Sequence, residues 1–390
     1  MALIINEEQQ MLKTSTKEFL DLKSPLSSLR DLRDNNYKTH DNKLWMEMVE
    51  MGWTALTIPE KYNGLNFGYV GLGQVLEEMG RKLTLSPIIS TVLMSSTLIS
   101  FSKNEILKEK LFQEIMNGSK LVSIAHEEGV HHNPNMLNAL LSKKGEGYVL
   151  NGYKNFVIDG SVSDYIIVSS KDESESNTML VLIDSKSDGI TFNNKVHMDS
   201  RTYSDMSFNN VIVEDSHLLS QGNDGDFILD KTFDIASVGL AAEMLGSVQE
   251  TFGITMSYLK EREQFGVKIG SFQALQHRSA IMFSEIELCK SIVLRALQAI
   301  DSNDSNLPRL ASLAKAKLGM TFKLVSNEAV QMHGGIGVTD DADVGFFLKR
   351  ARVIQRTLGD FTYHLDRVAK MNNYEDYKLL RFKRCFRLSN

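Results

Sequence analysis

The strongest limit on the fold is a helical periodicity that fills the C-terminal part of the chain. After Asp226, apolar residues recur every three or four positions, which is the spacing of one buried face of an α-helix. Further helical patterns cover Ala274–Ile300, Leu307–Val330 and Asp343–Met371. Long helices joined by short connections predict a four-helix bundle over residues 227–390. The first pattern consists of Val238, Ala241, Leu245, Val248, Phe252, Met256 and Leu259.

The rest of the chain divides into a helical part and a β part. Residues 1–119 show helical periodicity, and Asn6 can cap a helix that begins at Glu7. Between residues 120 and 226, short apolar runs are bounded by Gly, Asn, Asp or Ser, which predicts an antiparallel β domain. Within it, Asn151-Gly152 predicts a hairpin turn. The predicted fold class is α+β, with an N-terminal helical domain, a middle β domain and a C-terminal bundle.

Composition excludes several classes of function. The net charge of −6 gives no general attraction to nucleic acid or to an anionic membrane. No apolar run approaches the roughly 20 residues of a membrane span. Cys289 and Cys385 form neither a disulfide framework nor a zinc spacing, and adjacent His131 and His132 lack a third ligand, so we expect no metal. The N-terminus is too short and too acidic for a signal peptide, and the cytoplasm is the expected location.

The connection between the first two C-terminal helices carries more than a turn needs. Within Glu261–Gln276, an arginine, a Phe-Gly turn and a glutamine-rich helix start lie close together. The Arg262 guanidinium can bind an anionic group, while Phe265 and Gln273 can cover or hydrogen-bond a flat ligand. A plain helix–helix turn with a surface arginine is the alternative, and the sequence leaves both open.

Motifs spread along the chain resemble one family. Arg262–Ala280, REQFGVKIGSFQALQHRSA, looks like the signature R-x-x-F-G-x-x-I-x-x-F-Q of the acyl-CoA dehydrogenases. Gln331–Gly337, QMHGGIG, resembles the family's Q-x-x-G-G-x-G motif. Ile58–Gly64, IPEKYNG, and Leu76–Arg81, LEEMGR, look like its N-terminal landmarks. The order and spacing of these motifs match those of the family, and the likeness covers nearly the whole chain. The chain resembles bacterial members of the family, including those of mixed α2β2 type.

The resemblance implies a cofactor and a reaction. FAD accepts the β-hydrogen of an acyl-CoA thioester as hydride while a carboxylate base removes the α-proton, and the product is a trans-2-enoyl-CoA. The expected partners are an acyl-CoA substrate, an electron-transfer flavoprotein as acceptor, and further subunits in a dimer or tetramer. Arg262 matches the arginine that meets the FAD pyrophosphate, usually across a subunit interface. The other positions that match cofactor-binding residues are Phe265, Gln273, Gln331, Gly334, Gly335, Gly359 and Phe156, the last in place of a stacking tryptophan. Without the resemblance, Gly334-Gly335 is an ordinary helix stop.

The chain departs from the family pattern at the flavin ring and at the base. A T-E-P-x-A-G-S-D run becomes Ala125–His132, of which only Glu127 is kept, and a W-I-T triplet becomes Phe156–Ile158. The glutamate that usually precedes the glycine matched to Gly359 is Leu358. The base position of another branch, early in the first long helix, is Ala236.

Two carboxylates are candidates for the missing base. Glu243 lies two helical turns after Ala236, and its neighbours Gly239, Gly246 and Ser247 leave room for a ligand beside it. A buried partner of an arginine and a solvent-facing residue are the alternatives for Glu243. Asp360 is the second candidate, and it can instead hydrogen-bond the flavin ribose or pyrophosphate, or cap a helix that begins at Phe361. Arg201 matches a middle-domain arginine for which we expect a salt bridge.

Three functions remain open from the sequence. The first is an FAD-dependent acyl-CoA dehydrogenase with a non-standard base. The second is a catalytically incomplete partner subunit of a heteromeric acyl-CoA dehydrogenase, which the empty base positions favour. The third is a flavoprotein that acts on something other than a thioester, and no residue selects it.

Overall fold

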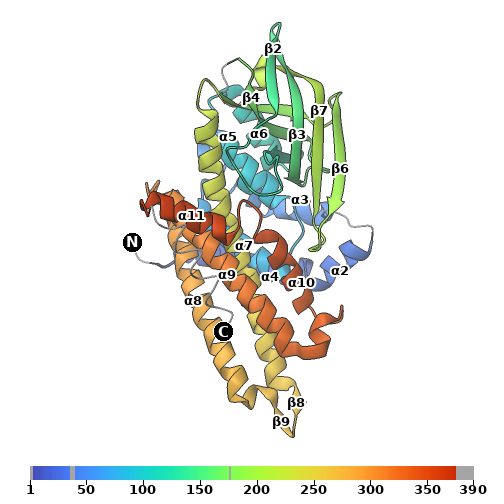
Figure 1. Ribbon diagram of the computed structural model, residues 1–390, viewed down its shortest axis with the longest axis vertical. Coiled ribbons are helices and arrows are strands. Elements are labelled where there is room, and N and C mark those ends of the chain that lie inside the picture. The colour runs from blue at the N-terminus through green and yellow to red at the C-terminus, as the bar shows by residue number, and fades with distance from the viewer. Residues whose placement is uncertain (1–2, 36–39, 175–176, 375–390) are drawn as a thin grey trace.

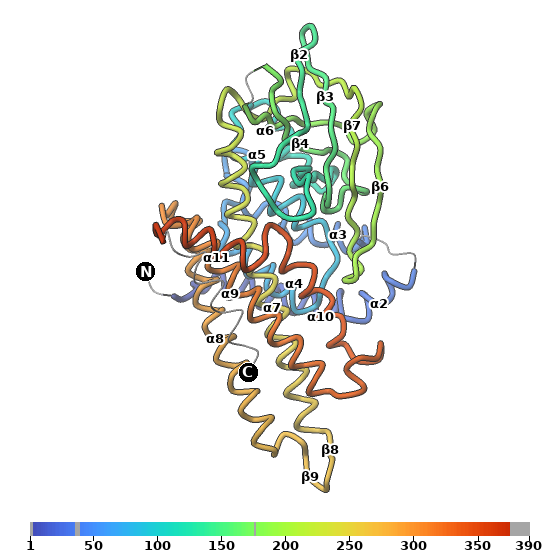
Figure 2. The backbone as a smooth tube through the Cα atoms, in the orientation of Figure 1, coloured from blue at the N-terminus to red at the C-terminus, as the bar shows by residue number. Residues whose placement is uncertain are grey.

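The computed structural model describes residues 3–35, 40–174 and 177–374. Helices, a β-sheet and longer helices follow one another along the chain, as predicted. The sheet lies at one end of an elongated molecule, and the helices α7 (Gly225–Glu261) and α8 (Gln273–Asp301) reach a narrow arm at the other end (Figures 1 and 2).

The N-terminal region consists of short helices. Asn6 caps α1 as predicted, since its side chain accepts a hydrogen bond from the Gln9 amide at 2.8 Å and Gln9 reciprocates at 3.0 Å. Pro87 precedes a π-helical segment, Ile88–Ser95, that continues directly into α5. The helices are α1 (Glu7–Lys23), α2 (Leu26–Asp34), α3 (Asn42–Glu50), α4 (Tyr69–Lys82), α5 (Ser96–Phe101) and α6 (Glu105–Met116).

The middle region is one mixed sheet in which most neighbours are antiparallel. The strands are β1 (Val122–Ala125), β2 (Leu140–Lys144), β3 (Gly147–Ile158), β4 (Tyr165–Asp172), β5 (Thr178–Asp184), β6 (Ile190–Val196) and β7 (Thr202–Glu214). Their order is β1-β4-β2-β3-β7-β6, with β5 on β4, and β4 pairs in parallel with β1 and β2. The predicted hairpin turn at Asn151-Gly152 is wrong. The chain turns at Gly145, whose φ is 62°, and Gly152 lies inside β3 beside a β-bulge, where an added Cβ would sit 2.5 Å from Ala139.

The C-terminal region holds α7, α8 and α9 (Leu307–His333) as long helices, followed by two shorter ones. The predicted helix over Asp343–Met371 is divided into α10 (Val344–Ile354) and α11 (Phe361–Met371). The break has a local cause, because Leu358 and Gly359 adopt left-handed φ values of 55° and 95° that no helix tolerates. The bundle is therefore built from the three long helices together with this broken pair.

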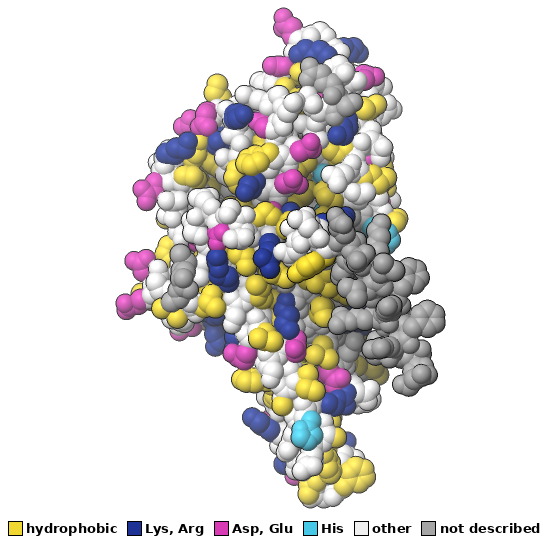
Figure 3. Space-filling model, turned by 60° about the vertical axis from the view of Figure 1, so that its left-hand side comes forward, with side chains coloured by type: hydrophobic (Ala, Val, Ile, Leu, Met, Phe, Trp, Pro, Cys, Tyr) yellow, Lys and Arg dark blue, Asp and Glu magenta, His cyan; other side chains and the backbone are white. Residues whose placement is uncertain are grey.

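A small hairpin joins α7 to α8 at the tip of the arm. It consists of β8 (Glu263–Gln264) and β9 (Val267–Lys268). Hydrophobic side chains gather at this tip (Figure 3), where Phe265 is 91% exposed. None of the helices in the described part of the chain combines the length and apolarity needed to cross a bilayer.

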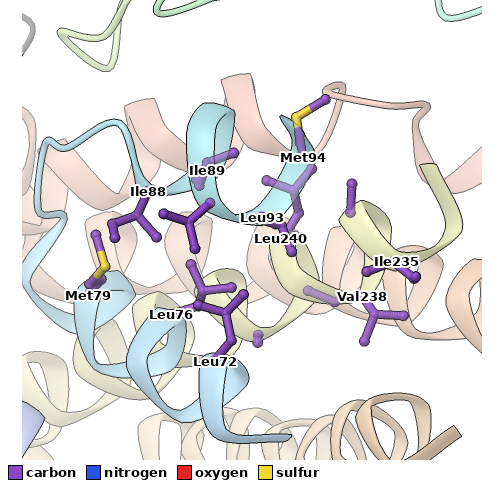
Figure 4. Close-up of a cluster of buried hydrophobic side chains, with 14 of the residues drawn as sticks. Leu72, Leu76, Met79, Ile88, Ile89, Leu93, Met94, Ile235, Val238 and Leu240 are labelled. Carbon is purple, nitrogen blue, oxygen red and sulfur yellow. The ribbon is translucent and has the colours of Figure 1, made fainter. Parts of the chain in front are cut away.

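The helix α4 lies directly against α7. An added Cβ at Gly80 would fall 1.9 Å from the Glu243 carbonyl oxygen, and one at Gly246 would fall 1.7 Å from the Glu77 carbonyl oxygen. Gly80 therefore serves this close approach and lies inside α4, which continues to Lys82. Leu76, Leu93 and Leu240 meet in the adjoining core (Figure 4).

Candidate functional site

Glu243 lies where the three regions of the fold meet. It is 2% exposed and accepts hydrogen bonds from Arg350 on α10, at 2.8 and 3.0 Å from Nη2 and at 3.2 Å from Nε. Arg201, which precedes β7, donates to Glu243 Oε1 at 2.8 Å. Arg350 also donates to Asp199 Oδ2 at 2.8 Å. Both carboxylate oxygens of Glu243 are thus held by guanidinium groups.

The charges around Glu243 decide its protonation state. Burial alone raises the pKa of Glu243, but Arg350 and Arg201 together outweigh burial, and the pKa falls below its ordinary value. A general base works best when its pKa lies near the working pH. The geometry therefore favours the ion-pair role that the sequence left open for Glu243, and it confirms the salt bridge predicted for Arg201.

The small residues near Glu243 do not leave space for a ligand, so that expectation is wrong. An added Cβ at Gly239 would lie 2.4 Å from the Leu93 side chain, and Gly246 faces the backbone of α4. Ser247 donates its hydroxyl hydrogen bond to the Gly80 carbonyl at 2.9 Å. The neighbouring helix occupies the volume that glycine leaves, which is why these residues are small.

The turn between α10 and α11 holds the position where the resemblance places a base. Leu358 is 7% exposed and presents an apolar side chain. Its carbonyl accepts a hydrogen bond from His364 Nε2 at 3.0 Å, and the Gly359 carbonyl accepts one from Lys315 Nζ at 3.1 Å. The Asp360 side chain accepts from the Tyr363 amide at 2.9 Å, which confirms the predicted cap on α11. The turn is rigidly held, but its one carboxylate is used as a helix cap.

Lys315 is the residue beneath this turn that sequence reasoning missed. It is 1% exposed, and Nζ also donates to the carbonyls of Ile354 and Gln355 at 3.2 and 3.3 Å. Burial lowers its pKa to about 7. A signal was present, because Lys315 lies on the same helix face as Ala311 and Leu318, where an apolar residue is expected.

The predicted nucleotide residues lie at the arm and at the end of α9. Arg262 follows α7 and is exposed, and Gln273 begins α8. Tyr258, one turn before Arg262 on α7, contacts His333 at the end of α9. The Tyr258 hydroxyl donates to the His333 carbonyl at 3.3 Å, and the two rings stack with their centroids 4.3 Å apart. Gly334 follows directly, with φ 65°.

The turn at Gly334 is open. A Cβ added at Gly334 or Gly335 would meet no atom within 4 Å, and Gln331 beside them is exposed. Among the described residues, Arg262 has no ion-pair partner in this chain. An exposed guanidinium and an exposed glycine turn at one end of the bundle form a surface that a phosphate group can approach.

The loop after β1 is built around a buried lysine. Lys154 Nζ donates to Glu128 Oε1 at 2.7 Å and to the His126 carbonyl at 3.1 Å. His126 is 4% exposed, its Nδ1 lies 2.9 Å from Ser169 Oγ, and burial lowers its pKa to about 4. His126 is therefore neutral at physiological pH. No group of three or more His, Cys, Asp or Glu within the described ranges is arranged to hold a metal ion.

Phe156 occupies the position matched to a stacking tryptophan. It lies near the end of β3 with φ 53°, and the residue is 38% exposed. Its amide donates to Asp205 Oδ1 at 3.2 Å, and its ring centroid is 6.0 Å from that of His197. The sheet that carries Phe156 on β3 lies at the opposite end of the molecule from the β8–β9 hairpin (Figure 1).

Domain models of one family match nearly the whole chain. The acyl-CoA dehydrogenase N-terminal domain matches residues 6–119, the middle domain matches 124–211 and the C-terminal domain matches 223–371. The chain belongs to the acyl-CoA dehydrogenase family. Members of this family are FAD-binding flavoproteins, and the order of domains agrees with the fold described above.

Relatives within this family differ in what their names say they act on. The chain is 26% identical to a 3-(aryl)acrylate reductase of Clostridium sporogenes, over 90% of this chain and 95% of the relative. It is 25% identical to the caffeyl-CoA reductase-Etf complex subunit CarC of Acetobacterium woodii, over 90% and 94%. The solved Tcur3481-Tcur3483 steroid ACAD superposes with a TM-score of 0.85 at 26% identity, over 94% and 98%. This similarity shows the family and leaves the substrate unassigned.

Proposed function

We propose that this chain is the subunit without a catalytic base in a heteromeric, FAD-dependent acyl-CoA dehydrogenase of the cytoplasm. A related second chain carries the base. The assembly removes the α-proton of an acyl-CoA thioester to that base and the β-hydrogen as hydride, which yields a trans-2-enoyl-CoA. FAD, when bound, supplies the hydride acceptor, and an electron-transfer flavoprotein receives the electrons.

The observation that carries the proposal is the ion-pair network at Glu243. Arg350 and Arg201 engage both of its oxygens, which makes Glu243 a buried ion-pair partner held in place by two guanidinium groups. Leu358 and Ala236 stand at the two positions where the resemblance expects a base, and Asp360 caps α11. The two carboxylates named from the sequence are thus used in an ion-pair network and in a helix cap.

The residues of this chain suit the adenosine and pyrophosphate of FAD, but they do not suit its flavin ring. Arg262, Phe265 and Gln273 on the arm, with the open turn at Gly334 and Gly335, suit a pyrophosphate and an adenosine. At the ring end, the resemblance implies a threonine hydroxyl where Ile158 stands and another hydroxyl where His126 pairs with Ser169. The chain is thus suited to complete the nucleotide half of a flavin site that it shares with its partner. We propose that Gln331 and Gly359 also contact this FAD.

Two relatives support an assembly of unlike chains. One is named as a subunit of a complex with Etf, and one solved structure carries the names of two chains, Tcur3481 and Tcur3483. An acceptor flavoprotein and a second dehydrogenase chain are therefore the partners that we propose for this chain.

The proposal is tested by the colour of the purified chain. Expressed alone, the chain should hold little flavin, and anaerobic acyl-CoA should not bleach the flavin absorbance. Purified from its native cells through a tag, it should bring down a second chain of similar mass, and this complex should be yellow and bleached by acyl-CoA. A yellow homotetramer of this chain alone that acyl-CoA bleaches would overturn the proposal.

A homomeric dehydrogenase that uses Glu243 or Asp360 as its base is the second candidate. The intact arm and glycine turn favour it, since a chain that holds its own FAD needs both. Here Glu243→Gln should abolish acyl-CoA bleaching while flavin is retained, and Glu287→Gln, at an exposed ion pair with Lys290, should change nothing. Bleaching that survives in Glu243→Gln excludes Glu243 as the base.

A further inference from the structure

The open turn at Gly334 is held at both of its ends by other parts of the fold. It forms a short 3₁₀ helix, Gly334–Val338, and the Thr339 amide closes it with a backbone hydrogen bond of 3.0 Å. Its 5 residues exceed the usual length of such a helix, because the hydrogen bonds of a 3₁₀ helix are poorly aligned. At the near end, His333 stacks on Tyr258 of α7. The shape of the turn therefore also depends on what holds its far end.

The far end is held by α2, which comes from the beginning of the chain. Asp340, a few residues after Gly334, is bound by both terminal nitrogens of Arg33. Nη1 donates to Oδ1 and Nη2 donates to Oδ2, each at 2.8 Å. Arg30, one turn earlier on the same face of α2, donates to Asp343 Oδ1 at 2.8 Å and to the backbone carbonyl of Asp340. The two arginines thus fix both the side chains and the backbone of the segment that leaves the turn.

A buried ring orders both arginines. Phe346 of α10 is 4% exposed, and its ring centroid lies 4.5 Å from Cζ of Arg30 and 5.3 Å from Cζ of Arg33. The helix α2 accordingly lies beside α10 (Figures 1 and 2). An isolated exposed ion pair contributes little, because ordering two long side chains offsets the attraction. Two arginines that already pack on a ring lose less freedom when they bind, so Arg30, Arg33, Asp340 and Asp343 form one ordered network, the α2 latch.

A turn that binds phosphate through its backbone amides must keep one shape, because every other shape lowers the fraction of molecules that can bind. The α2 latch acts on the residues that follow the turn and leaves the turn itself open to a ligand. We infer that Arg30 and Arg33 are positioning residues for the FAD pyrophosphate, since the α2 latch keeps the Gly334 turn in the shape that a phosphate group can enter. This inference rests on the proposed function, which puts the FAD nucleotide at this turn.

The test measures FAD release from the yellow complex purified from its native cells. Released flavin is followed by its fluorescence after dilution, at about 0.05 M and about 0.5 M salt, because salt screens exposed ion pairs. Arg33→Gln and Asp340→Asn should each speed FAD release about fivefold to tenfold at the lower salt, and added salt should then change the release rate less than in the wild type. Arg33→Lys keeps the charge but lacks the planar fork that binds both carboxylate oxygens, so its release rate should lie between those of Arg33→Gln and the wild type.

Two comparisons distinguish positioning from a general loss of stability. The double variant, Arg33→Gln with Asp340→Asn, should release FAD no faster than the faster single variant, because the two residues act through one contact. In protein from which FAD has been removed, amide hydrogen exchange of residues 334–340 should rise in these variants, while exchange in α8 stays unchanged. The matched control is Lys143→Gln, which removes an exposed ion pair with Asp215 and a ring contact with Tyr148 on the sheet and should change neither measurement.

Unchanged FAD release in both Arg33→Gln and Asp340→Asn would overturn the inference. An effect no larger than that of Lys143→Gln, or effects that add in the double variant, would do the same. If Arg33→Gln does not assemble, Asp340→Asn decides, because the Asp340 side chain is 57% exposed and the substitution keeps its size.

The outcomes also separate this inference from the proposed function. A mixed complex that acyl-CoA bleaches, and whose α2 latch variants release FAD at the wild-type rate, overturns only the inference. A yellow homomer of this chain that acyl-CoA bleaches overturns the proposed function. The same release measurement on that homomer then decides by itself whether the α2 latch positions the turn.

Discussion

Removing Glu243 should destabilise the fold far more than removing an ordinary surface glutamate. In Glu243→Ala, Arg350 loses three hydrogen bonds of 2.8 to 3.2 Å and keeps Asp199, while Arg201 loses one of 2.8 Å. Breaking a buried ion pair by removing one partner costs about 3–5 kcal/mol, because a buried charge is left uncompensated. Since Arg350 retains one carboxylate, we expect about 3–4 kcal/mol at pH 7.

The assay is equilibrium unfolding in urea, followed by circular dichroism and by intrinsic fluorescence, with coincident transitions as the check on two-state behaviour. Glu287→Ala is the matched control, because its partner Lys290 is 45% exposed on the side chain and the pair lies on the surface of α8. An exposed pair contributes about 0–1 kcal/mol. If Glu243→Ala costs no more than this control, the network does not hold the three regions together and the reasoning is refuted.

The loss of unfolding free energy in Glu243→Ala should depend on pH. The pKa of Glu243 in the folded protein lies below its ordinary value of 4.5, because Arg350 and Arg201 outweigh burial. A carboxylate whose pKa is depressed on folding stabilises the fold above its unfolded pKa, and that contribution is lost as the pH falls through the folded pKa. The cost of Glu243→Ala should therefore be full at pH 7 and shrink below about pH 4. A cost that grew on acidification would contradict this assignment.

Three further predictions concern single contacts. Gly246→Ala should cost about 3 kcal/mol, because its Cβ would fall 1.7 Å from a backbone oxygen of α4, whereas Gly253→Ala on the same helix meets no atom within 4 Å and should stabilise by about 0.5–1 kcal/mol in the same urea assay. Lys315→Met leaves three carbonyls without their donor and should cost about 1–3 kcal/mol, while Lys317→Met, at a partly exposed pair, should cost less than about 1 kcal/mol. Arg262→Ala should weaken FAD retention by the purified complex by about tenfold to a hundredfold, measured by flavin release on dilution, and Arg309→Ala should not.

The fold and the position of the nucleotide residues were accessible from the sequence because they depend on local or repeated signals. Helical spacing predicted the order of the regions. Asn6 and Asp360 were predicted as helix caps, and the structure confirms both. Arg262 and Gly334 stand in motifs with fixed spacing. The hairpin at Asn151-Gly152 failed because the pair serves a bulge inside β3, and whether a turn or a bulge forms depends on the neighbouring strands.

Side-chain identity alone determined that no carboxylate stands at Leu358 or Ala236. Only the tertiary structure decided what Glu243 does, since Arg350 lies more than a hundred residues along the chain and nothing near it in sequence marks it as a buried cation. The packing of the His132, Phe233 and Tyr363 rings likewise depends on three segments that meet only after folding. The physical reason is the same in both cases: a charge or a ring has its effect through the groups it touches, and those contacts are set by packing between distant segments rather than by spacing along one of them.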